Sequence, residues 1–534
     1  MNHFIIAPVV VPAVIGGLII LWMRHDMLLQ RVFSTVGTAI LLGVALYLAF
    51  HASSGEVFVY RLGNWLAPFG IVLMLDRLAA LMLVLTAFLA LIVQLYAIGS
   101  GWDRKGWHFH ALWQFQMMGI MGAFLTGDAF NLFVFFEVML IASYGLMIHG
   151  GGSLRLRAGV QYVIVNLLGS VLFLAALGTL YAVTGTLNMA DMAVKVAQMP
   201  ADDTALLRTG AVLLMLVFAI KAALVPLHFW LPSTYANAPG PVAALFAIMS
   251  KVGIYAIIRF YTLVFPGDSV VETIIADMLL PAALLTLIVG QIGVLGGRHL
   301  GRVAALSAVA SIGTLVIAVS MFTPASISAA LYYTIHSTLA AAAMFLIADL
   351  IAARRGGELW LTPRPAIRNG GLIAVMFFAA AIAVAGLPPL SGFVGKLLVL
   401  DATRADPWWI GIWATILVTS IFAIVGLGRA GSMLFWLPFQ MQRAEAPATP
   451  AADSPAPKAP MPPRLEPDEQ TQGVEDAVAP SLAFASVGAL LAALVALTLF
   501  ARPALEMTDT ISQQLFNPAP YIEAVLIRQE GARQ

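Results

Sequence analysis

Five ionisable residues stand inside long apolar stretches of this sequence, where a charge is costly. They are Glu137, Lys221, Lys251, His336 and Lys396. A charged side chain at the centre of a bilayer costs about 3 kcal/mol or more, so such residues usually face a bundle interior or water and mark ion or proton pathways. Carboxylate, ammonium and imidazole groups can each load and release a proton. We therefore expect these five residues to form a proton relay.

Glu137 and Lys221 are expected to act as a pair of opposite charges. Glu137 follows Asp128, at the outer end of its helix, by nine residues, which places it about 13 Å into the span. Lys221 has a similar depth in a neighbouring span, and a buried lysine, unlike an arginine, can lose its proton. The alternatives are a permanently paired structural carboxylate for Glu137 and a lysine that snorkels to the interface for Lys221.

The other three residues extend the same hypothesis. Lys251 is mid-span, and Lys396 follows a proline-rich interruption. His336 can relay protons through both ring nitrogens, although a lone histidine in a span is often a satisfied packing residue.

Further polar residues are candidate auxiliaries. His228 shares a helix face with Lys221 and either continues the path or caps a short half-helix, whereas Tyr255 stands one turn after Lys251. Asp349, near the inner end of its span, is either an exit group or a surface anchor. At the outer surface we expect Asp76 to form a local ion pair with Arg77, and Arg259 fits a snorkelling role equally well.

The composition predicts an all-α polytopic membrane protein that positions these residues. Of 534 residues, 61% are hydrophobic and 10% are charged, the mean hydropathy is +0.92, and soluble domains carry about 25% charged residues. With about 20 apolar residues needed per crossing, we expect fourteen spans. They cover roughly 3–23, 32–51, 70–98, 110–126, 129–149, 157–184, 207–228, 240–265, 274–297, 302–322, 328–353, 370–402, 408–437 and 479–500.

Two of these spans should be broken helices. The seventh contains Pro226 within "KAALVPLHFWLP", and the twelfth contains Pro388 and Pro389 within "AGLPPLSGFVGK". Proline removes a backbone donor, and such interruptions survive in a membrane only where protein or a wet cavity satisfies the freed groups. The two breaks lie five spans apart, which predicts inverted five-helix repeats formed by spans 4–8 and 9–13. A chance match of Leu-Pro-Leu segments is the alternative.

Loop charges and composition predict the orientation and the segments. Loops after odd-numbered spans carry twelve Lys and Arg residues and loops after even-numbered spans carry four, which places the odd loops in the cytoplasm and both termini outside. The Pro/Ala-rich stretch 440–480 is expected to be a disordered cytoplasmic linker, and the tail after span 14 to hold a short surface helix. The expected segments are 1–109 (spans 1–3), 110–265 (first repeat), 274–437 (second repeat), 440–480 (linker) and 479–534 (span 14 and tail).

Several classes of function find no support in the sequence. It contains no cysteine, so disulfides and thiolate metal sites are excluded. We find no spacing typical of metal or haem ligands and no phosphate-binding motif. The near-balance of 28 basic and 27 acidic residues gives no sign of a nucleic-acid partner. We expect no cofactor.

Longer segments of the sequence resemble a known family. "NLFVFFEVMLIASYGLMIHGG", "IKAALVPLHFWLPSTYANAPGPVAALFAIMSKVGIYAIIR" and "GLPPLSGFVGKLLVL" look like the antiporter-like subunits shared by respiratory complex I and the Mrp multisubunit cation/proton antiporters. The match covers roughly residues 71–437, and "FFEVMLIASYGLM" looks most like the D-type Mrp subunits.

The resemblance implies a fourteen-helix fold and a proton path through Glu137, Lys221, Lys251, His336 and Lys396. It implies a transporter subunit without a redox cofactor, assembled with other Mrp subunits in a bacterial cytoplasmic membrane, with proton flow coupled to Na⁺ or K⁺. The alternative is a proton-pumping subunit of a complex I-type NADH:quinone oxidoreductase or a membrane-bound hydrogenase. A quinone-binding enzyme and a structural scaffold are more distant alternatives.

Overall fold

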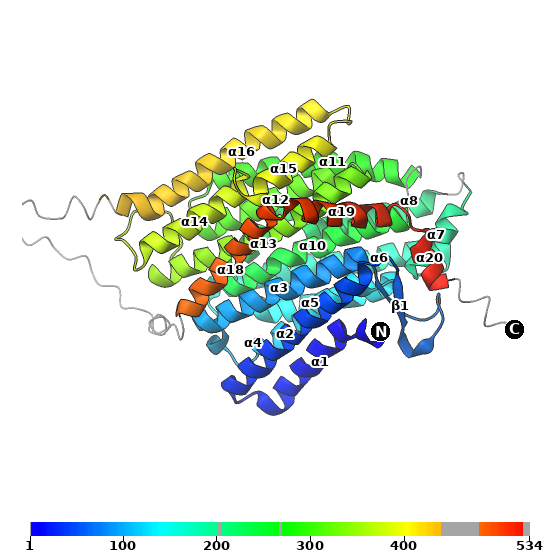
Figure 1. The fold of residues 1–534 in the computed structure, drawn as a ribbon, viewed down its shortest axis with the longest axis horizontal. Coiled ribbons are helices and arrows are strands. Elements are labelled where there is room, and N and C mark those ends of the chain that lie inside the picture. The colour runs from blue at the N-terminus through cyan, green and yellow to red at the C-terminus, as the bar shows by residue number, and fades with distance from the viewer. Residues whose placement is uncertain (1, 201–203, 266–269, 439, 441–479, 527–534) are drawn as a thin grey trace, which may run out of the picture.

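A computed structural model describes residues 2–200, 204–265, 270–438, 440 and 480–526 (Figure 1). Apart from its two end residues, the expected linker over 440–480 lies outside the described residues. Helices dominate the described chain, so the all-α prediction is confirmed.

The helices follow one another along the chain with short connections. In the first half they are α1 (Ala7–Leu18), α2 (Met27–Ala52), α3 (Arg77–Ser100), α4 (Phe109–Leu125), α5 (Ala129–Met147), α6 (Ser153–Thr184), α7 (Met189–Ala197), α8 (Ala205–Ala222), α9 (Trp230–Asn237) and α10 (Gly240–Leu263). In the second half they are α11 (Val270–Gly296), α12 (Leu300–Val319), α13 (Pro324–Arg354), α14 (Gly370–Ala385), α15 (Ser391–Ala402), α16 (Trp409–Gly431), α18 (Pro480–Leu499), α19 (Ala501–Leu515) and α20 (Ala519–Leu526).

The chain is an integral membrane protein. Among the described residues, 11 helices are long and apolar enough to cross a membrane when α8 and α9 are taken together. Two shorter apolar helices, over Ala7–Met23 and Gly370–Ala385, lie where further spans were expected. The count of fourteen and the grouping into two repeats stay predictions.

One expected span begins differently from its prediction. Residues 70–75 were assigned to span 3, but β2 (Val72–Leu75) pairs antiparallel with β1 (Phe58–Arg61) in a small hairpin. A short apolar run fits a strand as well as a helix by hydropathy. The helix starts later because the Asp76 carboxylate accepts a hydrogen bond from the Ala79 amide at 2.8 Å, which caps α3.

Two helices are interrupted at the predicted positions. α8 is followed by Ala223, which has a left-handed φ of 58°, and α14 is followed by Gly386, with a φ of 76°. In both cases this residue stands three positions before a proline, Pro226 or Pro389. A left-handed residue ends a helix because the next amide turns away from the helix axis.

One helix, α10, lies fully buried at the centre of the bundle. α10 is buried along its whole length and packs against α8, α13 and α3. α2, α6, α11, α16 and α18 are about one-third buried and turn apolar side chains outward. Figure 1 shows long helices running side by side, with α1 and α2 at one flank and α16 at the other.

The C-terminal helices hold onto the bundle. α19 lies along α13, where the Ser512 hydroxyl donates to the Pro324 carbonyl at 2.5 Å. The Gln514 amide group donates to the Gly55 carbonyl at 3.0 Å and accepts from the Arg77 amide at 3.1 Å. The expected surface helix, α19, therefore packs across the ends of α2, α3 and α13.

Candidate functional site

The five predicted relay residues come from five different helices. Glu137 is on α5, Lys221 in the last turn of α8, Lys251 in the middle of α10, His336 on α13 and Lys396 on α15. Glu137 is partly exposed, whereas the other four are between 1% and 8% exposed. α10 and α13 pack against each other, so the series crosses from one expected repeat to the other between Lys251 and His336.

Glu137 and Lys221 are connected through α6. The Ser170 hydroxyl donates to the Glu137 carboxylate, and the Lys221 ammonium donates to the side-chain carbonyl of Asn166 at 3.2 Å. Ser170 also reaches the Asn166 backbone carbonyl at 3.0 Å. The two expected partners thus each contact a neutral residue of α6, and these two residues are one turn apart; among the described residues no direct ion pair joins Glu137 to Lys221.

At the break after α8, the backbone groups around Lys221 form hydrogen bonds with other parts of the protein. The Trp230 indole donates to the Ile220 carbonyl at 3.0 Å, and the Val225 amide donates to the Thr286 hydroxyl of α11 at 2.9 Å. Groups freed by the interruption therefore find partners in the protein, as a membrane requires. Lys221 also stands at a helix C-terminus, where the helix dipole favours a cation.

Lys251 is the most deeply buried of the five residues. It is 1% exposed, and within the part of the chain that the structure describes its ammonium nitrogen has no hydrogen-bond partner. Gly253, two residues later, lets α10 approach α8: a Cβ there would lie 2.9 Å from the Phe218 carbonyl and 3.1 Å from the Lys221 Cβ. A buried cation without a partner is costly, which marks Lys251 as a site that can give up its proton.

His336 reaches across the second break. Its Nδ1 lies 2.9 Å from the Ser391 hydroxyl at the start of α15. A Cβ on Gly392 would lie 2.9 Å from the ring Nε2 and 2.0 Å from the Ala383 carbonyl. The glycine thus allows the imidazole to sit between the two halves of the interrupted helix.

Lys396 folds back onto the same break. Its ammonium donates to the Ala385 carbonyl at 2.8 Å and to the Ser420 hydroxyl of α16 at 2.8 Å. Ala385 is the last residue of α14, so Lys396 satisfies a carbonyl that the interruption frees. The two breaks are therefore completed by different groups, an indole and a hydroxyl at the first and a lysine at the second.

Two of the candidate auxiliaries, Tyr255 and His228, lie on α10 and in the turn that follows α8. Tyr255 donates to the Phe124 carbonyl at 2.7 Å and accepts from Arg259. It therefore belongs to a polar cluster with Arg259 in the C-terminal half of α10. His228 lies in the turn Leu227–Phe229 with its Nδ1 unpartnered among the described residues.

The prediction of a local ion pair between Asp76 and Arg77 at the start of α3 is wrong. Asp76 is bonded to Arg259 of α10, at 2.5 and 2.9 Å in a bidentate arrangement, and both are almost fully buried. Arg77 instead donates to the Ser53 carbonyl at 2.9 Å. Arg259 is therefore an interior residue and does not snorkel.

Asp349 sits in a polar cluster on α13. Its carboxylate accepts from the Tyr96 hydroxyl at 2.8 Å and from the Trp102 indole at 3.0 Å. The Lys105 ammonium lies 3.6 Å from the centre of the same indole ring. Burial lowers the pKa of Lys105, and the Asp349 carboxylate partly opposes this. The surface-anchor interpretation does not fit these interior contacts.

Sequence reasoning missed the bridging residues Asn166 and Ser170. They are neutral, so a search for charges passes over them. A signal was present: Tyr162, Asn166 and Ser170 follow one another at four-residue intervals, which puts three polar groups on one face of an apolar helix. Ser391 and Ser420, the partners of His336 and Lys396, are not part of a comparable four-residue series of polar side chains.

The described residues offer no group of three or more histidine, aspartate or glutamate side chains that could hold a metal ion. The arrangement consists of buried proton-carrying groups with neutral hydroxyl and amide neighbours. Such a set can store and pass protons.

Comparisons with known proteins agree on one family. The family described as "NADH:quinone oxidoreductase/Mrp antiporter, TM" matches residues 126–423. The D-type subunit of a probable K⁺/H⁺ antiporter from Rhizobium meliloti is 39% identical over 474 residues, covering 82% of this chain and 87% of the relative. The D-type subunit of a Na⁺/H⁺ antiporter from Bacillus subtilis is 38% identical with the same coverage.

Solved structures give the same result. A chain in the structure of the Mrp complex from Dietzia sp. superposes with a TM-score of 0.84 at 28% identity, over 98% of this chain and 100% of that one. A chain of respiratory complex I from Thermus thermophilus superposes with a TM-score of 0.73 at 24% identity, over 96% of this chain and 99% of that one. The second likeness concerns the fold alone.

Proposed function

This chain belongs to the NADH:quinone oxidoreductase/Mrp antiporter family, as a transporter subunit of the antiporter D type, and we propose that it moves protons in exchange for Na⁺ or K⁺. The observation that carries this proposal is the connection from Glu137 through Ser170 and Asn166 to Lys221. Three more buried ionisable residues, Lys251, His336 and Lys396, continue from it. The alternative of a redox-driven subunit rests on a likeness of fold and is not favoured by any contact in the site.

The relay works by changing the charge of one neighbour at a time. A protonated Lys221 stabilises an ionised Glu137, because opposite charges near each other favour their charged forms. When Lys221 passes its proton toward Lys251, that support is removed and Glu137 takes up a proton in turn. Ser170 can both donate and accept a hydrogen bond, so it can follow either state of Glu137.

The second half of the relay is built around the interrupted helix. His336 contacts Ser391 on one side of the break, and Lys396 holds the end of α14 on the other. Imidazole passes protons through its two nitrogens, and here it stands between the lysine of α10 and the lysine of α15. Asp349, further along α13, is proposed as the group that exchanges protons with the cytoplasm.

We propose that the chain works inside a hetero-oligomer in a bacterial cytoplasmic membrane, with both termini on the outer side. The relatives are named as subunits, and the Mrp neighbour is part of a complex. Figure 1 places the start of α1 and the C-terminal helix α20 toward the same end of the bundle, which supports termini on one side.

The test is cation-dependent dissipation of a pH gradient in vesicles that contain the complete complex. Glu137→Gln and Lys221→Met should each slow Na⁺- or K⁺-driven proton movement at least about tenfold, equivalent to about 1.4 kcal/mol in barrier height. Both side chains keep a similar size while losing the ability to change charge.

Matched controls are Glu506→Gln and Lys195→Met, which alter exposed ion pairs on α19 and α7. They should retain full activity, and co-purification of the other subunits should show that every variant assembles. Full antiport by assembled Glu137→Gln and Lys221→Met complexes would show that the proposed relay is wrong.

A further inference from the structure

An open cavity of about 490 Å³ lies where the first two helices meet the start of α4. It is lined by Met27, Leu28, Arg31, Arg104, Gly106 and Trp107. α1, continued by the turn Ile19–Met23, ends beside it, α2 begins at Met27, and α4 begins at Phe109. Because three helices start or end here, the cavity lies near the level where the membrane meets water.

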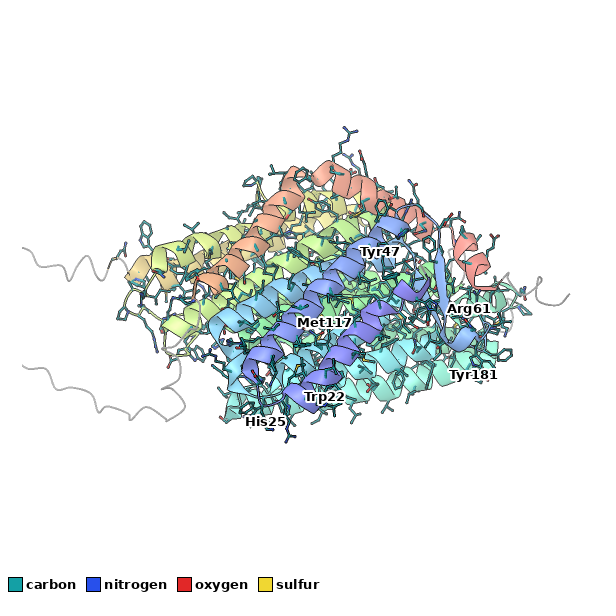
Figure 2. All side chains as sticks on the ribbon, turned by 60° about the horizontal axis from the view of Figure 1, so that its bottom comes forward. Trp22, His25, Tyr47, Arg61, Met117 and Tyr181 are labelled. Carbon is teal, nitrogen blue, oxygen red and sulfur yellow. The ribbon has the colours of Figure 1, made fainter. Side chains whose placement is uncertain are left out.

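Exposed aromatic and apolar side chains line this cavity, at Leu28 and Trp107, or stand close to it along the chain, at Trp22. Trp22 is 75% exposed, Leu28 is 69% exposed and Trp107 is 57% exposed. Figure 2 shows Trp22 and His25 together at one end of the helices, away from Arg61. Tryptophan is enriched at membrane interfaces, where its ring meets the headgroup layer. The positions of Trp22 and Trp107 fit that level.

The cavity carries an excess of positive charge. Two of its six lining residues, Arg31 and Arg104, are basic and none is acidic, while the neighbouring segments hold two acids, Asp26 and Asp103. The Asp26 carboxylate caps α2 by accepting from the Leu28 and Leu29 amides at 2.9 and 3.1 Å. The other acid, Asp103, is fully buried, so the surface that faces the cavity is basic.

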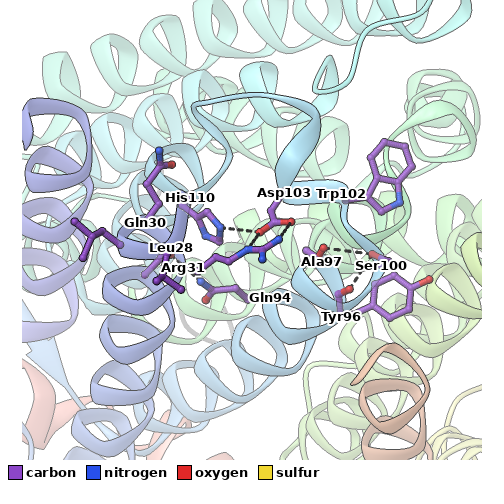
Figure 3. Close-up of polar contacts among 12 residues, drawn as sticks. Leu28, Gln30, Arg31, Gln94, Tyr96, Ala97, Ser100, Trp102, Asp103 and His110 are labelled. Atoms are coloured by element: carbon purple, nitrogen blue, oxygen red, sulfur yellow. Dashed lines mark hydrogen bonds and ion pairs between the residues drawn. The ribbon is translucent and has the colours of Figure 1, made fainter. Parts of the chain in front are cut away.

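Asp103 fixes the position of one cavity arginine. It accepts two hydrogen bonds from Arg31, at 2.5 and 2.8 Å, and lies 3.2 Å from His110 (Figure 3). Burial alone would raise the pKa of Asp103, but the hydrogen bonds from His110 and Arg31 hold it below its usual value. The carboxylate therefore stays ionised, and Arg31 is held at the cavity wall while Arg104 remains exposed.

We propose that this cavity binds the headgroup of an acidic phospholipid. Arg104 would contact the phosphate, Arg31 would line the inner wall, and the acyl chains would lie along the exposed apolar faces of α1 and α2. The loop charges predict that this end of the helices faces the cytoplasm, where anionic lipids attract basic residues close to the membrane. The site is separate from the proton relay and does not depend on it.

The experiment places a photo-crosslinking amino acid at position 28, next to the cavity, in the complete complex. The complex is reconstituted in nanodiscs with equal amounts of phosphatidylglycerol and phosphatidylcholine, irradiated and analysed by mass spectrometry. We expect phosphatidylglycerol adducts to exceed phosphatidylcholine adducts at least about fivefold. Arg104→Gln should bring the ratio close to one, whereas Arg104→Lys, which keeps the charge, should retain most of the preference.

The matched control is Arg157→Gln, which removes an exposed arginine at the start of α6 and should leave the ratio unchanged. Equal capture of both lipids would overturn the proposal, as would adducts with a peptide of another subunit, which would make the cavity a protein interface. Loss of the phosphatidylglycerol adduct on addition of inorganic phosphate would show a site for the free anion and would also overturn it.

Discussion

Ser170 and Asn166 give the two charged residues a connection that a direct ion pair would not allow. A buried ion pair in direct contact is held firmly, and breaking it leaves an uncompensated charge. With a hydroxyl and an amide between them, Glu137 and Lys221 each keep a hydrogen-bond partner when the other changes its charge. The neutral bridge therefore lowers the cost of switching.

Removing the hydroxyl of Ser170 should slow transport without preventing assembly. A hydrogen bond to a charged group contributes about 1.5–3 kcal/mol, so Ser170→Ala should reduce antiport roughly tenfold in the vesicle assay. Thr179→Ala is the matched control, because the Thr179 hydroxyl also bonds a carbonyl of α6 but lies on its exposed side. Equal activity of both variants would contradict the bridging role.

Ionisable residues in apolar helices could be located from the sequence because their cost makes them rare, and the four basic candidates are buried. Their partners could not be located, since Asn166, Ser391 and Ser420 are common residues whose importance depends on which helices pack together. Asp76 illustrates the same limit: its partner Arg259 is 183 positions away, beyond any local pattern.

At the level of the helices, the contact between α8 and α10 sets the distance between Lys221 and Lys251, two lysines of the proposed relay. Gly253 makes that contact possible, since α10 passes the carbonyl of Phe218 and the amide of Ala222 with no room for a side chain. The break in α8 follows directly, so its last turn is held between α10 and α6. Packing at one glycine thus fixes the helix end that carries Lys221.

A side chain at position 253 should therefore separate the two helices. Gly253→Val would place its Cβ 2.9 Å from backbone atoms, and overpacking of this kind costs typically about 1–3 kcal/mol. We expect a lower thermal unfolding midpoint and weaker antiport for the purified complex. Gly178→Ala on α6, where a Cβ meets nothing within 4 Å, should leave both unchanged, and an unaltered midpoint for Gly253→Val would contradict the close contact.

Hydropathy predicted the helices well because a membrane requires long apolar segments, and proline predicted both interruptions because it cannot continue the backbone ladder. The hairpin of β1 and β2 was not predicted, because its second strand, residues 72–75, is too short to show the alternation of side chains that marks a strand. The helix start at Arg77 could have been inferred from Asp76, which is a favourable residue for capping.

Across the whole molecule, one buried ion pair ties together parts of the chain that are distant in sequence. Asp76 at the start of α3 holds Arg259 of α10, and the Arg259 guanidinium lies 5.4 Å from the ring of Tyr521 in α20. The C-terminal helices are thereby attached to the same end of the bundle as the hairpin.

Breaking this pair should destabilise the protein far more than breaking an exposed one. Asp76→Asn leaves the buried Arg259 charge uncompensated, which costs about 3–5 kcal/mol for a buried pair, and we expect a clear drop in the thermal unfolding midpoint. Asp76→Leu combined with Arg259→Leu should recover part of the loss. Arg502→Ala, which removes the exposed pair with Glu506, should cause no comparable drop, and equal shifts would contradict the interior role of Asp76.

The spacing of Asn166 and Ser170 along α6 affects how proton transfer responds to the membrane potential. Ser170 and Asn166 are four residues apart, so the contacts of Glu137 and Lys221 are offset by about 6 Å along the helix, roughly a fifth of a hydrocarbon core about 30 Å thick. A proton passing from Glu137 to Lys221 thus travels toward the end of α6 that the loop charges assign to the cytoplasm. At about 2.3 kcal/mol per 100 mV for a full crossing, this step alone carries about 0.5 kcal/mol per 100 mV. The membrane potential would therefore directly bias the first transfer of the proposed relay.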